Sequence, residues 1–220
     1  MVKKNILICV DRDGTIVYDK KYHLGRQRNW KKLVKILPGV VSGIKRLTKK
    51  FPDAKIYMIT NQPGIAIKDF PLLTQKRANE VCKLIIKELE KQGAKIDGYI
   101  VCGKATTAYT KKRGEYKFNK KMVGNFPCIK PKPGMINQIL KKLKWDKRNT
   151  DIFVMGDRLS DVETGLNVNG YGYGIFVPFK ERPKEIKKVK KKIKKENKKR
   201  IYTSKGFLDG VDWIIKTTSS

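Results

Sequence analysis

The sequence lacks the features that mark membrane proteins, secreted proteins and disulfide-rich proteins. No stretch approaches the roughly 18 consecutive apolar residues that a membrane-spanning helix needs. The apolar run at 5–10 is short, and the charged residues 11–13 follow it without a small-residue cleavage site, so it predicts a buried strand rather than a signal peptide. The four cysteines form no CxxC pair, which favours free, mostly buried thiols over a disulfide framework. We therefore expect a cytoplasmic protein without a membrane span.

Acidic residues are also scarce, with 20 Asp and Glu against 52 Lys and Arg and a formal net charge of +32. Such an excess suits a polyanionic partner such as nucleic acid. Lysine, however, outnumbers arginine heavily, whereas specific phosphate and base contacts tend to favour arginine. The charge therefore fits a compositional drift towards lysine, a nucleic-acid partner or another acidic partner.

Apolar runs and amphipathic segments alternate along the chain. The pattern predicts strands at 5–10, 55–59, 96–102, 151–155 and 173–177, and helices at 39–50, 72–92, 133–144 and from about 160. This alternation is typical of an α/β fold with a doubly wound, Rossmann-like parallel sheet, here of about five strands with helices on both faces. We expect a single domain over 1–220 with a minimal cap.

Two basic segments interrupt this pattern. Residues 103–128 are polar and irregular, which predicts an inserted loop that overhangs the site. Residues 180–200 have apolar positions at Ile186, Val189 and Ile193, the spacing of a lysine-rich amphipathic helix. This helix is either a solvated surface element or a contact for nucleic acid or an acidic membrane. Residues 207–216 regain an apolar periodicity and should pack back on the domain.

Polar residues follow three of the predicted strands. Asp11, Thr60 and Asp157 each come directly after a strand, and the carboxyl ends of parallel strands share one edge of the sheet, where ligands bind. Asp11 and Asp13 lie two apart on a turn that Gly14 permits. One carboxylate can attack phosphorus and the other can transfer protons. Each motif alone also fits an ordinary turn.

Further residues suit the binding of phosphate and a metal ion. The Thr60 hydroxyl and the backbone N–H groups after it can bind a phosphoryl group, and Lys130 near a helix start adds positive charge. Asp157 can complete a magnesium site with Asp11. We add Asn61 and Arg12 as candidate substrate-binding residues. Further candidates are Arg158 and Asp161, of which Asp161 is placed to hold a metal-bound water or Lys130.

The order DRDGT, ITNQPG, KPKPG and GDRLSD resembles the haloacid dehalogenase superfamily over about residues 5–178. The resemblance implies Asp11 as nucleophile, Asp13 as general acid and base, and Thr60 and Lys130 as phosphate ligands. It also implies Mg²⁺ on Asp11, Asp157 and the Asp13 carbonyl. The chain looks most like the small-cap branch (subfamily IIIA) that contains histidinol-phosphate phosphatase and heptose 1,7-bisphosphate phosphatase.

Two departures from this branch put the substrate in doubt. Of the zinc loop usual there, Cys102 and Cys128 match two ligands, but Lys104 and Phe126 replace the others, so we expect no zinc. Ile129 replaces a substrate-binding arginine. The leading hypothesis is a phosphomonoesterase for a small phosphorylated substrate, either a sugar phosphate or bisphosphate or histidinol phosphate. The alternatives are a polynucleotide 3′-phosphatase and a non-catalytic nucleic-acid-binding protein.

Overall fold

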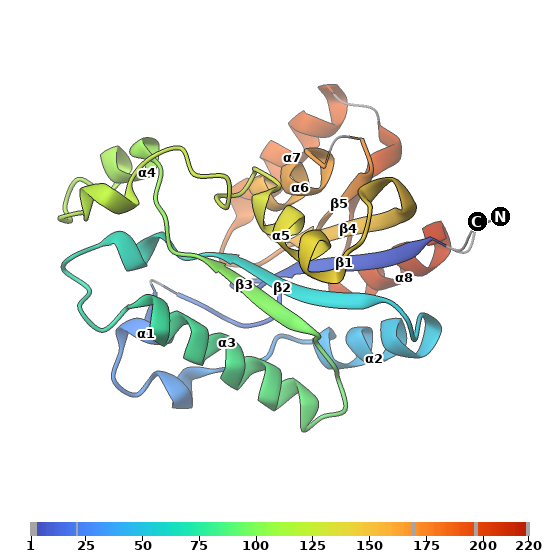
Figure 1. Cartoon of the computed structure of the whole chain (residues 1–220), viewed down its shortest axis with the longest axis horizontal. Helices are drawn as coiled ribbons and strands as arrows, with labels where there is room; N and C mark the ends of the chain where they lie inside the picture. The colour runs from blue at the N-terminus through green and yellow to red at the C-terminus, as the bar shows by residue number, and fades with distance from the viewer. Residues whose placement is uncertain (1–3, 21, 169, 196–197, 219–220) are drawn as a thin grey trace.

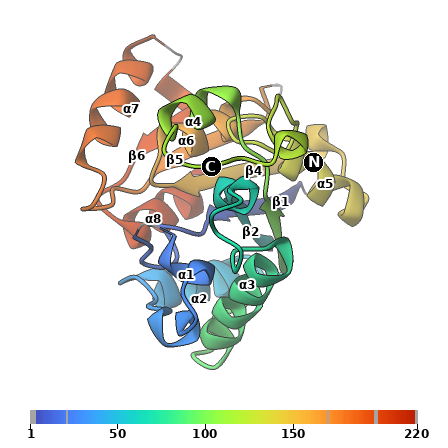
Figure 2. The same cartoon turned by 90° about the vertical axis from the view of Figure 1, so that its left-hand side faces the viewer.

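A parallel sheet with helices on both faces forms the body of the protein (Figures 1 and 2). The computed structural model describes residues 4–20, 22–168, 170–195 and 198–218. The strands are β1 (Asn5–Asp11), β2 (Lys55–Asn61), β3 (Gly98–Cys102), β4 (Thr150–Gly156), β5 (Gly172–Phe176) and β6 (Ile201–Thr203). The α-helices are α1 (His23–Arg26), α2 (Val40–Lys50), α3 (Gln75–Glu90), α4 (Thr107–Lys112), α5 (Gly134–Leu143), α6 (Leu159–Leu166), α7 (Pro183–Lys195) and α8 (Phe207–Thr218). Short 3₁₀ turns lie at Trp30–Leu33, Pro63–Ala66, Lys120–Met122, Lys147–Asn149 and Lys198–Arg200.

The strand order, β3-β2-β1-β4-β5-β6, places β1 near the centre of the sheet, and every neighbouring pair is parallel. The chain runs outward from β1 to β3, returns to β4 on the other side of β1, and then runs outward to β6. The direction of winding therefore reverses between β1 and β4. Ligands of doubly wound sheets bind beyond the carboxyl ends of the strands at such a point, and Asp11 ends β1 there.

The two faces of the sheet carry separate hydrophobic clusters. Ile8 and Val10 of β1 pack towards α2, α3 and α8, whereas Leu7 and Cys9 pack towards α5. All four side chains are fully buried, because β1 has a strand on each side and helices above and below. This burial explains why β1 is a continuous apolar run rather than an alternating one.

The doubly wound α/β fold is confirmed. We expected about five strands, and the described residues contain six. The additional strand, β6, is three residues long and only Ile201 in it is buried, so no alternating pattern marks it. The loop at 103–128 contains the short helix α4, which buries no residue and therefore shows no apolar periodicity.

Helix α7 confirms the amphipathic helix expected within 180–200. Val189 is fully buried, and Ile186 and Ile193 pack around it against a cluster on α6 and β5. The apolar stripe is thus explained by packing inside the protein, while the lysines between these positions line the other side of the helix. Helix α8 packs against α2 through buried apolar side chains, as the periodicity of 207–216 predicts. No helix among the described residues is both long and apolar enough to cross a membrane.

The expectation of four free thiols is wrong for one pair. Cys102 and Cys128 form a disulfide, with Cα atoms 5.6 Å apart, whereas Cys9 and Cys82 are free and buried. Cys102 ends β3, and Cys128 lies two residues before Lys130. The fold brings these two points together at one edge of the sheet, so that the disulfide closes the base of the 103–128 loop.

Candidate active site

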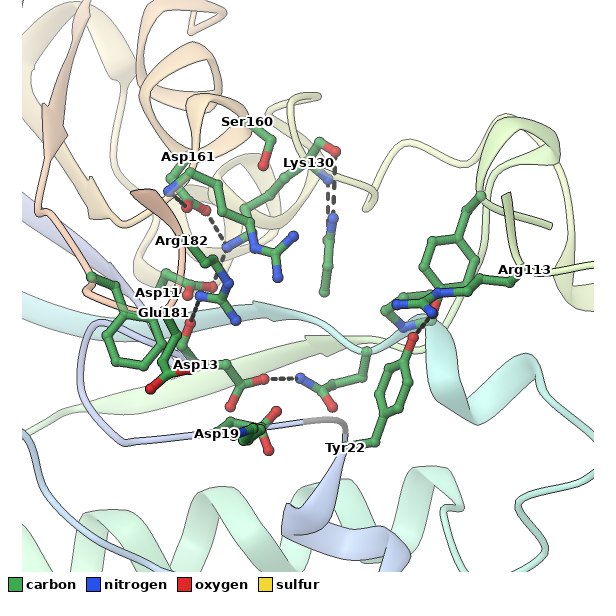
Figure 3. Close-up of a pocket in the computed structure, with 17 residues that line it drawn as sticks. Asp11, Asp13, Asp19, Tyr22, Arg113, Lys130, Ser160, Asp161, Glu181 and Arg182 are labelled. Carbon is green, nitrogen blue, oxygen red and sulfur yellow. Dashed lines mark hydrogen bonds and ion pairs between the residues drawn. The ribbon is translucent and has the colours of Figure 1, made fainter. Parts of the chain in front are cut away.

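A cavity of about 480 Å³ lies at the carboxyl ends of the central strands (Figure 3). The predicted site residues in its lining are Asp11, Asp13, Asn61, Lys130, Arg158 and Asp161. Asp157, Thr60 and Arg12 are buried and are not part of the lining. The expected convergence of strand ends is therefore observed, with three of the predicted residues placed beneath the cavity surface.

Lys130 lies between two carboxylates at the floor of the cavity. Its Nζ atom donates hydrogen bonds of 2.5 Å to Oδ1 of Asp11 and of 2.5 Å to Oδ1 of Asp161. The Lys130 side chain is only 3% exposed. Burial alone would lower the pKa of Lys130, but the charges of Asp11 and Asp161 outweigh it and raise the pKa above its usual value. Lys130 therefore keeps a fixed positive charge beside Asp11.

Asn61, the last residue of β2, holds the backbone of Lys130 in place. Its Oδ1 accepts a hydrogen bond of 3.1 Å from the Lys130 backbone N–H, and its Nδ2 donates one of 3.4 Å to the Lys130 carbonyl. Thr60, 1% exposed, accepts a hydrogen bond of 2.9 Å from Gln62 at its Oγ1. In this arrangement Asn61 positions Lys130, and the hydroxyl of Thr60 supports Gln62.

Arg12 turns away from the cavity and pairs with Asp13. Its Nε and Nη2 atoms donate to the two carboxylate oxygens of Asp13 at 2.6 and 2.8 Å, and Gln62 donates to Asp13 at 2.6 Å. Burial would raise the pKa of Asp13, but the charge and hydrogen bonds of Arg12 hold it below its usual value. Arg12 is 1% exposed, a placement that favours a role in orienting Asp13 over the substrate contact we expected.

Three buried aspartates form a cluster that could hold a metal ion. One carboxylate oxygen from each of Asp11, Asp157 and Asp161 lies within 4.8 Å of the others. Asp157 Oδ1 is buried without a hydrogen-bond partner, which is costly unless a further cation or donor approaches it. Burial, followed by the charge of Asp11, raises the pKa of Asp157 to about 7, and burial raises that of Asp11 to about 6.

This donor set fits Mg²⁺, which takes oxygen ligands from a few carboxylates and keeps several waters. The Asp13 carbonyl oxygen lies in the same region, because Arg182 Nη1 donates to it at 2.7 Å and also donates to Asp157 Oδ2. A single cationic nitrogen thus bridges a carbonyl and a carboxylate that were both expected to be metal ligands. Gly14, at φ 90°, makes room for this, because a Cβ atom there would lie 2.7 Å from Asp157 Oδ2.

Asp161 lies at the start of α6 and organises its first turn. Its Oδ2 accepts a hydrogen bond of 3.0 Å from the Arg158 backbone N–H, while its Oδ1 accepts the one from Lys130. The expected contact of Asp161 with Lys130 is therefore observed. The Arg158 side chain lines the cavity, next to the buried Asp157 in sequence.

Arg182 and Tyr22 are among the lining residues that were not singled out from the sequence. Arg182 lies just before α7, and the basic composition of 180–200 hides it among many lysines. Tyr22 lies opposite the inserted loop, and its hydroxyl contacts that of Tyr109. The loop does overhang the site, as expected, since Tyr109 and Arg113 line the cavity (Figure 3).

Comparison with known proteins gives one family and a consistent set of relatives. The family model "polynucleotide kinase 3 phosphatase" matches residues 6–165. A D-glycero-β-D-manno-heptose-1,7-bisphosphate 7-phosphatase of Haemophilus influenzae is 29% identical over 162 residues, which cover 74% of this chain and 76% of the relative. The histidine biosynthesis bifunctional protein HisB of Blochmanniella floridana is 26% identical over 168 residues, which cover 76% of this chain and 40% of that protein.

Solved structures share the fold. D,D-heptose 1,7-bisphosphate phosphatase from B. bronchiseptica, complexed with magnesium and phosphate, superposes with a TM-score of 0.69 at 18% identity, covering 96% of this chain and 98% of the other. A HAD-like phosphatase from Mesorhizobium loti gives a TM-score of 0.62 at 23% identity, over 77% and 71% of the two chains. The match of the family model over most of the chain shows that it belongs to the polynucleotide kinase 3 phosphatase family and is a phosphatase of the haloacid dehalogenase superfamily.

Proposed function

We propose that the protein is a magnesium-dependent phosphomonoesterase for a small, multiply anionic substrate and that it acts through an aspartyl-phosphate on Asp11. The observation that carries this proposal is the placement of Asp11 in the cavity floor, bonded to Lys130 and clustered with Asp157 and Asp161. A carboxylate that can attack, a fixed cation and a cluster suited to a metal ion meet there at one point.

Asp11 is the nucleophile in this proposal. One of its carboxylate oxygens forms a bond to phosphorus as the bond from phosphorus to the leaving oxygen breaks. With a pKa of about 6, set by burial, Asp11 is mostly ionised at neutral pH and can attack. Lys130 offsets the negative charge of Asp11 and of the phosphoryl group as it approaches.

Asp13 transfers the protons. It gives a proton to the leaving oxygen in the first step and takes one from the attacking water in the second, when the bond from phosphorus to Asp11 breaks and phosphate is released. The contacts with Arg12 and Gln62 favour the ionised carboxylate, so the geometry observed suits the second step. To act as the acid, Asp13 must loosen its pairing with Arg12.

Magnesium completes the site. Asp11, Asp157 and the Asp13 carbonyl would hold the ion, which would supply positive charge to the phosphoryl group when bound. The unpartnered oxygen of Asp157 supports this assignment, because a buried carboxylate oxygen without a donor is otherwise unfavourable.

Basic side chains in the walls of the cavity suit a substrate with a second anionic group, although Asp19 and Glu181 also line it. Arg113 and Lys20 line the cavity together with Arg158, and Arg113 lies across it from Asp11 (Figure 3). The resemblance implies a substrate-binding arginine at the position that Ile129 holds in this chain, so in our proposal the charge for a second phosphate comes from Arg113 on the inserted loop. A sugar bisphosphate fits this arrangement, in agreement with the similarity to the heptose-1,7-bisphosphate 7-phosphatase of Haemophilus influenzae, and histidinol phosphate is the other small candidate.

A nucleic-acid 3′-end is the second candidate substrate, favoured by the net charge and by the name of the matching family. An experiment that tests this substrate must leave α7 in place. This helix packs on α6, and deleting it would expose the apolar side chains between the two helices. Replacing the exposed residues Lys187, Lys190 and Lys191 by glutamine removes charge without disturbing the apolar stripe. The matched control replaces three exposed lysines on the opposite face of the sheet, Lys45, Lys49 and Lys50.

The deciding experiment measures phosphate release with magnesium on histidinol phosphate, a sugar bisphosphate and a 3′-phosphorylated oligonucleotide. We expect kcat/KM for a small substrate to exceed that for the oligonucleotide by at least about tenfold. The α7 lysine variant should then behave as its control does on every substrate. Preference for the oligonucleotide, lost with the α7 lysines and kept in the control, would overturn the assignment and favour nucleic-acid end repair.

A further inference from the structure

Arg182 reaches the active site from outside the part of the chain that the family model matches. It lies 17 residues beyond residue 165, where the match ends, and directly precedes Pro183 at the start of α7. Its side chain is 17% exposed and lines the cavity (Figure 3). The residue is therefore a feature of this chain's C-terminal region rather than of the matched motifs.

The guanidinium of Arg182 makes two contacts with one nitrogen. Nη1 donates to the Asp13 carbonyl at 2.7 Å and to Oδ2 of Asp157, and the group also lies 5.2 Å from the centre of the Phe179 ring. Among the described residues, Lys130 neutralises Asp11 and Asp161, whereas Arg182 is the cation bound to Asp157. Arg182 thus supplies the positive charge that this buried carboxylate needs in the structure as it stands.

The same two oxygens are those that fit a magnesium ion. A guanidinium nitrogen between the Asp13 carbonyl and Asp157 Oδ2 occupies the place from which an ion would contact both, and two cations cannot share it. Binding of Mg²⁺ at these ligands therefore requires Arg182 to move away. The affinity measured for the metal then includes the free energy lost when the Arg182 contacts break.

The backbone of Arg182 is held while its side chain can move. The Arg182 N–H donates to the Phe179 carbonyl at 2.9 Å, and its own carbonyl accepts from Glu185 at 3.1 Å. Glu185 in turn accepts a hydrogen bond of 3.0 Å from the Leu159 N–H at the start of α6. The docking of α7 therefore fixes where the side chain starts, and the adjoining cavity offers space into which it can swing.

We propose that Arg182 is the resident cation of the metal-free site, which holds Asp157 and the Asp13 carbonyl in place and is displaced when Mg²⁺ binds. This inference rests on the proposed function, because it assumes that the cluster takes Mg²⁺. Arg182 is then a positioning residue, whose removal changes metal affinity before it changes chemistry.

The test is magnesium binding measured by calorimetry, without substrate, on wild type, Arg182→Gln and the control Lys180→Gln. Lys180 is an exposed cation two residues away, so its loss reproduces the change in net charge without touching the ligands. We expect Arg182→Gln to bind Mg²⁺ roughly five- to fiftyfold more tightly than wild type, and Lys180→Gln to change affinity less than about twofold. Equal affinity in wild type and Arg182→Gln, or equal tightening in the control, would overturn the inference alone. Absence of Mg²⁺ binding by folded wild type would overturn the proposed metal dependence as well.

A second measurement uses the wild-type protein, so that it does not depend on the folding of a variant. The side-chain N–H signals of Arg182 in an NMR spectrum should be protected from solvent exchange without metal, because the group is largely buried and ion-paired. Added Mg²⁺ should remove this protection over the same concentration range in which calorimetry detects binding. Signals that stay protected when the site is saturated with metal would contradict displacement.

Discussion

Replacing Lys130 by methionine should destabilise the metal-free protein strongly. The substitution keeps a long, flexible side chain but removes the cation that contacts both Asp11 and Asp161, each at 2.5 Å. All three side chains are at most 8% exposed, so water cannot replace the lost partner. Removing one member of a buried ion pair costs about 3–5 kcal/mol, a large part of a typical free energy of unfolding of about 5–15 kcal/mol.

The loss should grow with pH. Burial raises the pKa of Asp11 from 3.8 to about 6 even with Lys130 present, so the folded state binds more protons than the unfolded state between these values. Stability contributed by the protonated carboxyl therefore falls as pH rises through about 6. Without Lys130 the pKa of Asp11 lies higher still, and each further unit costs about 1.4 kcal/mol once the group ionises.

Urea unfolding in EDTA at pH 5 and pH 8 measures this effect. Lys132→Met is the matched control, because Lys132 is only partly buried and its hydrogen bond to the Asn125 carbonyl is exposed to solvent. The control should change the free energy of unfolding by no more than about 0.5 kcal/mol at either pH. A loss below about 1 kcal/mol for Lys130→Met at pH 8, or an equal loss at both pH values, would refute the reasoning.

Three further predictions concern other parts of the structure. Asp13→Asn should lower kcat by about 10²- to 10⁴-fold, because an amide cannot relay a proton, and an unchanged kcat would exclude Asp13 from proton transfer. The pKa of His23, the single histidine, should lie above 6.5 in an NMR titration because of its hydrogen bond with Asp19, and Asp19→Asn should lower it. Since the pKa of His23 is raised in the folded state, the stability that the His23–Asp19 pair contributes should be complete below pH 6.5 and be lost as pH rises through the folded pKa. Urea unfolding of wild type and Asp19→Asn at pH 5 and pH 9 would detect this loss. Cys102→Ser should lower the free energy of unfolding by about 3.5 kcal/mol, from the loop entropy released over a separation of 26 residues, and an unchanged midpoint in urea would show that the disulfide constrains little.

The sheet and the position of the site were accessible from the sequence for a physical reason. Buried parallel strands read as apolar runs, and the first polar residue after each run marks the carboxyl edge. The positions of Asp11 at the end of β1 and of Asp157 after β4 followed directly from this rule. β6 did not, because a strand of three residues with one buried side chain leaves no pattern.

Other features depended on contacts between distant segments. The turn at Asp11 to Gly14 does not reveal that Arg12 points into the core and pairs with Asp13. The disulfide depended on the return of the 103–128 loop to the end of β3. The contact of Arg182 with the Asp13 carbonyl depends on how α7 docks on α6. The two residues are 169 positions apart in the sequence. The local sequence pattern contains no information about contacts between segments that are far apart in the chain.

The central claim is that Asp11 forms a covalent bond to phosphorus, and trapping that intermediate tests it most directly. The protein is mixed with magnesium and its preferred substrate, quenched in acid within the first turnovers and treated with borohydride, which converts an acyl phosphate of aspartate to homoserine. Peptide mass spectrometry should find homoserine at position 11 in wild type, and Asp11→Asn should show neither the modification nor turnover. Modification of a different carboxylate, or full turnover by Asp11→Asn, would contradict the account.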